Sequence, residues 1–178
     1  MNYLEADSRT GSYLKRWAGT SQLIVGSFYF WYAGNELQKS QTGLIRSILL
    51  SVLSNKPELC VPLFPDICRT IFSGHLKGQS LEFTTSELTA AFSKLISLSA
   101  EMLNNAKIMF IVDGLDEYSG NHNDICELFS QIEGSPSIKV LLSSRPIPVC
   151  VERFREFPKL RLEDLTWNDI KKYTEDRL

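Results

Sequence analysis

A short, almost entirely apolar run at residues 107–112 (KIMFIV) limits the possible folds more than any other feature of this sequence. The run lacks the alternation of a strand with one solvated face, so it predicts a β-strand that is covered on both faces. Residues 23–31 and 138–142 form similar runs, rich in β-branched and aromatic side chains. Strands of this kind are typical of parallel sheets, whose crossover connections are usually helices.

Segments with a helical period separate these runs. Residues 42–53 and residues 124–133 repeat apolar side chains every three to four positions, which predicts an amphipathic helix in each. Between them, Thr84 and Glu87 have the spacing of a capping box that starts a third helix. The apolar stripe expected of that helix consists of Leu88, Phe92, Leu95 and Met102.

Two further stretches have weaker patterns. Residues 55–79 contain several prolines and glycines, which favours a loop with short helical pieces. Residues 157–162 (FPKLRL) suggest a short last strand, and Thr166 is expected to cap a final helix that runs towards Leu178. The alternation of strands and helices along the chain predicts an α/β fold, with a mainly parallel sheet between helices in three layers.

Length and composition are those of one soluble globular domain, residues 1–178, with 43% hydrophobic and 22% charged residues. A net charge of −2 argues against nucleic acid or an anionic membrane as a partner. No apolar run approaches the roughly 18 residues of a membrane span, and residues 1–18 lack the apolar region of a secretory signal. We therefore expect a cytoplasmic protein.

The cysteines and tryptophans carry no motif of their own. Without a C-x-x-C pair, the cysteines are expected to be free thiols in a reducing compartment. The tryptophans are expected to be packing residues. The cysteines are Cys60, Cys68, Cys126 and Cys150, and the tryptophans are Trp17, Trp31 and Trp167.

Acidic residues follow directly after the run at 107–112, where the sequence reads Asp113, Gly114, Leu115, Asp116 and Glu117. Ligands of parallel sheets bind beyond the carboxyl ends of the strands. Three carboxylates this close repel one another unless a cation or a donor network offsets the repulsion, and Mg²⁺ with phosphate oxygens is one solution. A polar turn that ends a strand is the alternative, but the buried strand and the two further acids favour a site.

A basic residue follows the run at 138–142, where the sequence continues with Ser143, Ser144, Arg145 and Pro146. The guanidinium fork of an arginine in this position can bind a phosphate. A surface arginine in a turn is the alternative, and the position one strand–helix unit after the acids favours the phosphate role.

These segments resemble known motifs. IMFIVDGLDEY resembles a Walker B segment of the NACHT class, and KVLLSSRP resembles its sensor 1. SFYFWYAGNELQKSQTGLIRSILLSVL and RLEDLTWNDIKKY resemble further parts of fungal NACHT, or nephrocystin-like N-terminal, P-loop NTPase domains of the STAND class. The resemblance implies a helical lead-in at residues 1–22, core strands and helices at 23–142, and a sensor segment, last strand and terminal helix at 143–178.

The resemblance also implies site residues and a cofactor. Asp113 resembles the residue that orders Mg²⁺, and Asp116 and Glu117 resemble the catalytic acids that position or activate water. Arg145, with Ser144 beside it, resembles the sensor of the γ-phosphate. The cofactor of such a domain is Mg²⁺ with ATP or GTP.

The phosphate-binding loop of that class, G-x-x-x-x-G-K followed by Ser or Thr, does not occur in the sequence. The nearest segment, residues 34–40, has Gln38 in place of the second glycine and an acid at Glu36. We expect it to be a loop in which Ser40 or Thr42 caps the next helix. In the family the phosphate loop precedes a helix whose end looks like residues 1–4, so the domain is expected to be truncated and to lack its first strand.

This gap has consequences for binding. Each charge-assisted hydrogen bond contributes about 1.5–3 kcal/mol, so the loss of three or four removes on the order of 5 kcal/mol. That weakens nucleotide binding about a thousandfold. We expect weak or no binding and hydrolysis, and a last strand and N-terminal helices that are less secure than residues 23–142.

Three functions remain open at this point. The first is the truncated core of a signalling NTPase, a nucleotide-dependent switch. The second is a non-catalytic pseudo-NTPase that binds protein partners or self-associates. The third, an unrelated Mg²⁺-dependent phosphohydrolase, needs a second acidic strand end, and neither residues 23–31 nor 138–142 are followed by paired carboxylates.

Overall fold

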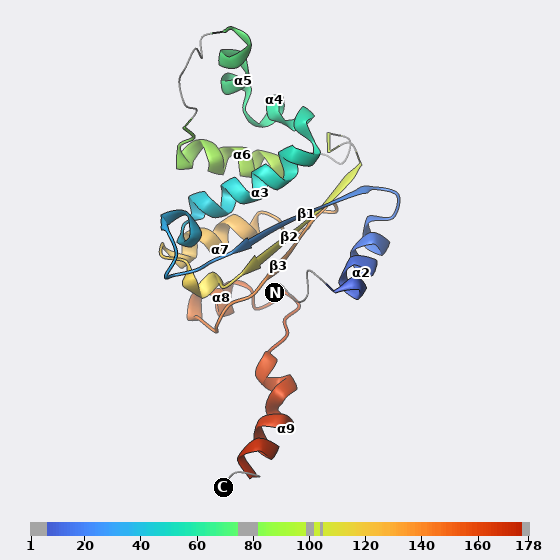
Figure 1. Cartoon of the computed structure of the whole chain (residues 1–178), viewed down its shortest axis with the longest axis vertical. Helices are drawn as coiled ribbons and strands as arrows, with labels where there is room; N and C mark the ends of the chain where they lie inside the picture. Colours follow the sequence, from blue (N-terminus) through green and yellow to red (C-terminus); the bar gives the residue numbers. More distant parts are fainter. Residues whose placement is uncertain (1–6, 75–81, 99–101, 104, 176–178) are drawn as a thin grey trace.

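The middle strand of the sheet is β2 (Ala106–Asp113) in the computed structural model, which describes residues 7–74, 82–98, 102–103 and 105–175. β1 (Gln22–Tyr29) and β3 (Ile138–Leu142) pair with β2 in parallel, one on each side, in the order β1-β2-β3 (Figure 1). Phe110 and Ile111 point to opposite faces and are both almost completely buried. The predicted α/β fold, with a parallel sheet flanked by helices, is confirmed.

One face of the sheet carries most of the hydrophobic core. Three helices cover it, and their apolar side chains form one buried cluster with Ile24, Ile108 and Phe110 (Figure 1). These helices are α3 (Gln41–Asn55), α6 (Thr85–Ser97) and α7 (His122–Ser130). α7 begins two residues before the predicted start because Asn121 accepts a hydrogen bond from the backbone N–H of Asn123 and caps the helix there.

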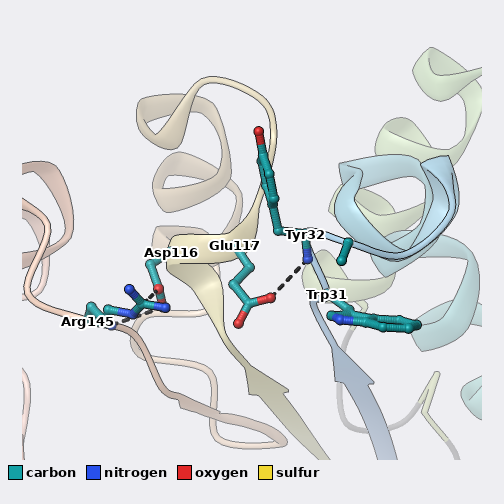
Figure 2. Close-up of a pocket in the computed structure, with 6 residues that line it drawn as sticks. Trp31, Tyr32, Asp116, Glu117 and Arg145 are labelled. Atoms are coloured by element: carbon teal, nitrogen blue, oxygen red, sulfur yellow. Dashed lines mark hydrogen bonds and ion pairs between the residues drawn. The ribbon is translucent and has the colours of Figure 1, made fainter.

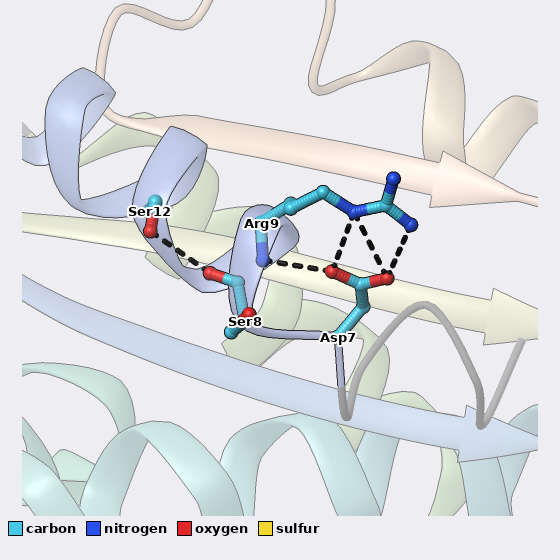
Figure 3. A network of polar contacts seen from close by, with 4 residues as sticks. All are labelled: Asp7, Ser8, Arg9 and Ser12. Atoms are coloured by element: carbon cyan, nitrogen blue, oxygen red, sulfur yellow. Dashed lines mark hydrogen bonds and ion pairs between the residues drawn. The ribbon is translucent and has the colours of Figure 1, made fainter.

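The opposite face of the sheet carries α2 (Ser8–Ala18), a helix that lies within the stretch predicted as a lead-in (Figure 3). At its start, Asp7 accepts a 2.8 Å hydrogen bond from the backbone N–H of Arg9 and also pairs with the Arg9 guanidinium (Figure 3). At its end, the Trp17 ring lies 4.9 Å from Nζ of Lys139 and 5.7 Å from Nζ of Lys107. Trp17 is therefore the packing residue that was predicted. Residues 1–4, which carry part of the resemblance, lie outside the described residues.

The segment at residues 34–40 is a loop with a short 3₁₀ helix, η1 (Glu36–Lys39). Ser40 Oγ accepts a 3.2 Å hydrogen bond from the backbone N–H of Gly43 and caps α3, as predicted. A Cβ atom at Gly43 would lie 1.8 Å from the carbonyl oxygen of Leu37, so the loop packs directly onto the helix backbone. Lys39 pairs with Glu36 at 3.0 Å.

Short helical pieces follow α3, as the prolines predicted. Proline stands at the first helical turn of two of them, where its missing N–H costs nothing. The pieces are η2 (Pro57–Leu59), α4 (Cys60–Leu63) and α5 (Pro65–Phe72). Residues 75–79 of the predicted stretch lie outside the part of the chain that the structure describes.

The capping box of α6 is present, but the helix is shorter than its apolar stripe predicted. Thr84 Oγ1 accepts from the backbone N–H of Glu87 at 3.2 Å, and Glu87 accepts from the backbone N–H of Thr84 at 2.7 Å. The helix ends at Ser97 because Leu98 takes an extended conformation with ψ of 135°. Met102 is therefore not part of the stripe, and 52% of its surface is exposed.

The C-terminal segment differs most from the prediction. Residues 157–162 form no strand; Pro158 offers no N–H to a ladder, and Leu160 is 71% exposed. A short helix that the sequence did not predict, α8 (Pro148–Arg153), follows β3 instead. The last helix, α9 (Leu162–Glu175), starts before Thr166, whose hydroxyl donates to the carbonyl of Leu162 at 3.0 Å. The predicted last strand and the Thr166 cap are thus both wrong.

α9 extends away from the rest of the molecule (Figure 1). The final residues of its predicted course, up to Leu178, lie outside the described range. None of the helices described in the structure combines the length and the apolar character of a bilayer span.

Candidate functional site

The candidate site begins at the turn that leaves β2. Gly114 has a φ of +73°, a left-handed conformation that suits glycine, and it starts the 3₁₀ helix η3 (Leu115–Glu117). Leu115 is 1% exposed and anchors this turn in the core. Its backbone N–H donates to the carbonyl of Ser143 at 2.9 Å, so the turn after β2 is joined to the end of β3.

Asp113 lies at the carboxyl end of the middle strand and is half-buried. Its Oδ1 accepts a hydrogen bond from Ser143 Oγ, which in turn accepts from the backbone N–H of Gly114 at 3.2 Å. The carbonyl of Asp113 accepts from the backbone N–H of Phe30 at 2.9 Å. The backbone of Asp113 is therefore held from the β1 side, and its carboxylate is held from the β3 side by Ser143.

Asp116 and Arg145 are joined by one ion pair and one backbone hydrogen bond across the ends of β2 and β3 (Figure 2). Asp116 Oδ1 accepts from the backbone N–H of Arg145 at 3.0 Å, and Oδ2 lies 3.0 Å from Nε of the same residue. The Asp116 side chain is only 13% exposed, whereas that of Arg145 is 81% exposed. The carboxylate is thus held in place while most of the guanidinium faces solvent.

Glu117 connects η3 to the loop after β1. Its Oε2 accepts a 2.9 Å hydrogen bond from the backbone N–H of Tyr32 (Figure 2). Donors from different segments therefore satisfy the three acids, through Ser143, Arg145 and Tyr32. The sequence left open whether a cation or a donor network offsets the repulsion of these carboxylates, and the structure shows a donor network.

The acids do not form a metal cage by themselves. Among the described residues, no three His, Cys, Asp or Glu side chains are arranged to hold a metal ion. Mg²⁺ that arrives with a nucleotide needs only one or two carboxylates, because phosphates and water supply its other ligands. Asp113 fits that requirement, and a protein-only metal centre does not fit this part of the chain.

A cleft of about 390 Å³ lies beside these acids. The residues that line it are Trp31, Tyr32, Ala33, Asp116, Glu117 and Arg145. Trp31 is 54% exposed and Tyr32 is 69% exposed, so the prediction that Trp31 is a packing residue is wrong. Ligands of parallel sheets bind beyond the carboxyl ends of the strands, and this rule drew attention to Asp113. It would also have found both aromatic residues, because they follow β1 at the same edge of the sheet.

The two serines after β3 differ in what they contact. Ser144, the predicted cofactor-binding residue, is exposed, and its hydroxyl donates to the carbonyl of Arg145 at 2.7 Å. Ser143 contacts Asp113 and Gly114 instead. The sequence analysis gave Ser143 no role, and its place directly after a buried strand was the signal that could have found it.

The site can now be compared with known proteins. The family model described as "Nephrocystin 3, N-terminal" matches residues 9–145, which is most of the chain. The chain belongs to this family. The match includes every predicted site residue and ends at Arg145, just before the C-terminal segment in which sequence and structure disagree. Neither a search of curated proteins nor one of solved structures gives a match.

Proposed function

We propose that this nephrocystin 3 N-terminal domain is part of a nucleotide-responsive switch that binds Mg²⁺ together with ATP or GTP. The observation that supports the proposal is the grouping of Asp113, Asp116, Glu117 and Arg145 at the carboxyl edge of one parallel sheet. This edge is where α/β sheets bind their ligands. The resemblance of the two segments to Walker B and sensor 1 assigns the same residues to this chemistry.

Asp113 is the residue that would hold Mg²⁺, and Mg²⁺ would supply positive charge that offsets the charge of the phosphates. Asp113 is suited to this role because Ser143 orients its carboxylate from β3. In the same proposal, Asp116 and Glu117 orient the attacking water. Glu117 already stands at the cleft with one oxygen bound to Tyr32.

Arg145 would respond to the γ-phosphate by exchanging partners. Its side chain is largely solvent-exposed, and Nε is the atom that contacts Asp116. A phosphate accepts hydrogen bonds from a guanidinium as a carboxylate does. Transfer of the Arg145 guanidinium from Asp116 to a phosphate would free Oδ2 of Asp116, so the conformation of the turn after β2 would depend on the bound nucleotide.

Binding should be weak, because the 178 residues contain no G-x-x-x-x-G-K motif to surround the phosphates. The test is a titration of fluorescent ATP and GTP analogues with Mg²⁺ against the whole chain, the Asp113→Asn variant and a control. Asp66→Asn is a matched control, since Asp66 is 85% exposed on α5 and pairs only with its neighbour Arg69 among the contacts described.

Weak binding that Mg²⁺ enhances and only Asp113→Asn removes would support the proposal. Equal binding by all three proteins would show that the nucleotide does not use this edge of the sheet. Tight binding that Asp113→Asn abolishes would show that another segment replaces the missing loop. Absence of binding by a folded sample at millimolar nucleotide would favour the second candidate function.

The second candidate is a non-catalytic interaction module that binds protein partners or a second copy of the chain. The exposure of Trp31 and Tyr32 beside the site favours it, because aromatic side chains contribute strongly to protein interfaces. Sedimentation over a range of concentrations tests for self-association in the unmodified chain, in Trp31→Ala and in Trp167→Ala, whose tryptophan is 65% exposed on α9. Self-association lost only in Trp31→Ala would support an interface at the cleft; its persistence there would exclude Trp31 from the contact.

A further inference from the structure

Two cysteines that are far apart in the sequence lie side by side in the fold. Sγ of Cys126 on α7 is 3.4 Å from Sγ of Cys150 on α8. Both residues are free thiols, and at most 6% of either is exposed. They have no part in the proposed nucleotide site, and the sequence gave no reason to pair them.

The two helices that carry these thiols are already in contact at more than one point. Arg153 of α8 forms an ion pair with Glu127 of α7. A bond between the sulfur atoms would therefore join elements that pack together in the reduced protein, with a small movement of the two side chains. Disulfides form readily only where the backbone already brings the sulfur atoms close.

A cleft lies next to this pair. An open cleft of about 410 Å³ lies between α7 and α8, and Cys126 contributes to its lining. The other lining residues are Asn123, Pro148, Val149, Glu152 and Arg153. Cys126 lines this cleft although its own surface is 0% exposed, so a small oxidant in the cleft lies beside the pair.

We propose that Cys126 and Cys150 are a redox modification site, at which hydrogen peroxide or a small organic disulfide converts the two thiols to an intramolecular disulfide. With peroxide, the Cys126 sulfur attacks one oxygen, the O–O bond breaks, and a sulfenic acid and water form. The Cys150 sulfur then attacks the Cys126 sulfur, the S–S bond forms, and a second water leaves. Two thiols and one peroxide thus give one disulfide and two waters. With a small organic disulfide, two exchange steps through a mixed disulfide give one protein disulfide and release two small thiols.

Electrostatics supports this order of attack. Burial, followed by the contact with Cys126 and the nearby Asp116 carboxylate, raises the pKa of Cys150 to about 12. Burial also raises the pKa of Cys126, but the hydrogen bond from Cys150 and the Arg153 guanidinium act in the opposite direction. Cys126 therefore has more thiolate character than Cys150, and both react slowly compared with an activated cysteine.

The disulfide would have an effect at the candidate site. The loop that carries Arg145 leads directly into α8, so a bond between α8 and α7 would restrict how far that loop can move. This consequence rests on the proposed function, whereas the disulfide itself does not. A chain that never binds nucleotide can still form the bond.

Peptide mapping of the unmodified chain tests the proposal without any mutation. The reduced protein is treated with hydrogen peroxide or oxidised glutathione, its remaining thiols are alkylated under denaturing conditions, and it is digested without reduction. We expect a linked peptide that contains Cys126 and Cys150, and a fall in free thiols from four to two. Dithiothreitol should restore all four, and oxidation should raise the unfolding temperature.

Variants separate this pair from the other two cysteines. The Cys60→Ser, Cys68→Ser double variant keeps both thiols of the pair and should give the same linked peptide at the same rate. Cys150→Ala should give none, with a sulfenic acid on Cys126 trapped by dimedone instead. The proposal fails if the oxidant modifies Cys60 while Cys126 and Cys150 both remain free to be alkylated. It also fails if the linked peptides come from different molecules.

Discussion

The sheet region and the C-terminal segment both contain large apolar residues, but these are buried in the sheet region and exposed in the C-terminal segment. In β2, Phe110 is completely buried between the neighbouring strands and the helix layer, where its ring packs near that of Phe92. In α9, Leu162 and Trp167 are 69% and 65% exposed. The difference shows that an apolar side chain stabilises this fold only where a second layer covers it. The following variants test that contrast, in order of decreasing effect.

Phe110→Ala should have the largest effect on stability. The substitution leaves a cavity at a fully buried position and should lower the free energy of unfolding by about 3–5 kcal/mol. Urea denaturation followed by tryptophan fluorescence measures the change. A loss of less than about 1 kcal/mol would contradict the buried position of this ring in the core.

Gly43→Ala tests how closely the loop of η1 packs onto α3. The added Cβ would overlap the carbonyl oxygen of Leu37, so the chain must shift, at a cost of about 1–3 kcal/mol. Gly11→Ala is the matched control, because a Cβ there meets no atom within 4 Å and replaces glycine inside helix α2. The control should be stabilised by about 0.5–1 kcal/mol. Thermal unfolding of both variants gives the comparison, and equal effects would rule out the close packing at Gly43.

Thr84→Ala removes the side chain that caps α6. The backbone N–H of Glu87 loses its partner, so the free energy of unfolding should fall by about 1 kcal/mol. Chemical denaturation measures the loss, and Thr166→Ala is the comparison in the C-terminal segment. Thr166 lies inside α9 rather than at its start, so that variant should change stability by less than Thr84→Ala.

Glu87→Gln tests the acid side of the same capping box. Hydrogen bonds from the Thr84 hydroxyl and backbone N–H lower the pKa of Glu87 below the value usual for a glutamate. Its contribution to stability is therefore present above the unfolded-state pKa and is lost as pH falls through the lower folded-state pKa. The stability difference between the wild-type chain and Glu87→Gln should shrink from pH 7 to pH 3. A difference that is independent of pH would show that the charge of Glu87 plays no part.

Leu162→Ala should have the smallest effect. Its side chain is 69% exposed at the start of α9, so truncation should change stability by no more than about 0.5 kcal/mol. Denaturation under the conditions used for Phe110→Ala gives the direct contrast. A loss comparable to that of Phe110→Ala would show that another part of the protein, or a second copy, covers this helix in solution.

The predictions from sequence succeeded where the pattern was local. The run at 107–112 specified a strand buried on both faces, and the Thr84–Glu87 spacing specified the start of α6. The prediction of a short strand at residues 157–162 was wrong, because a strand forms only where a neighbouring strand pairs with its backbone N–H and C=O groups. The prediction that Met102 belongs to the apolar stripe of α6 was also wrong. Apolar periodicity does not show that the helix ends at Ser97.

The sequence by itself determined the α/β class, the family, and the presence of acids and an arginine after two buried strands. Apolar periodicity and residue order are enough for these features. The tertiary structure decided which groups pair: Asp113 with Ser143, Asp116 with Arg145, and Cys126 with Cys150. Each pair joins residues more than twenty positions apart, and only the parallel alignment of strands and the packing of α8 on α7 bring them within contact distance.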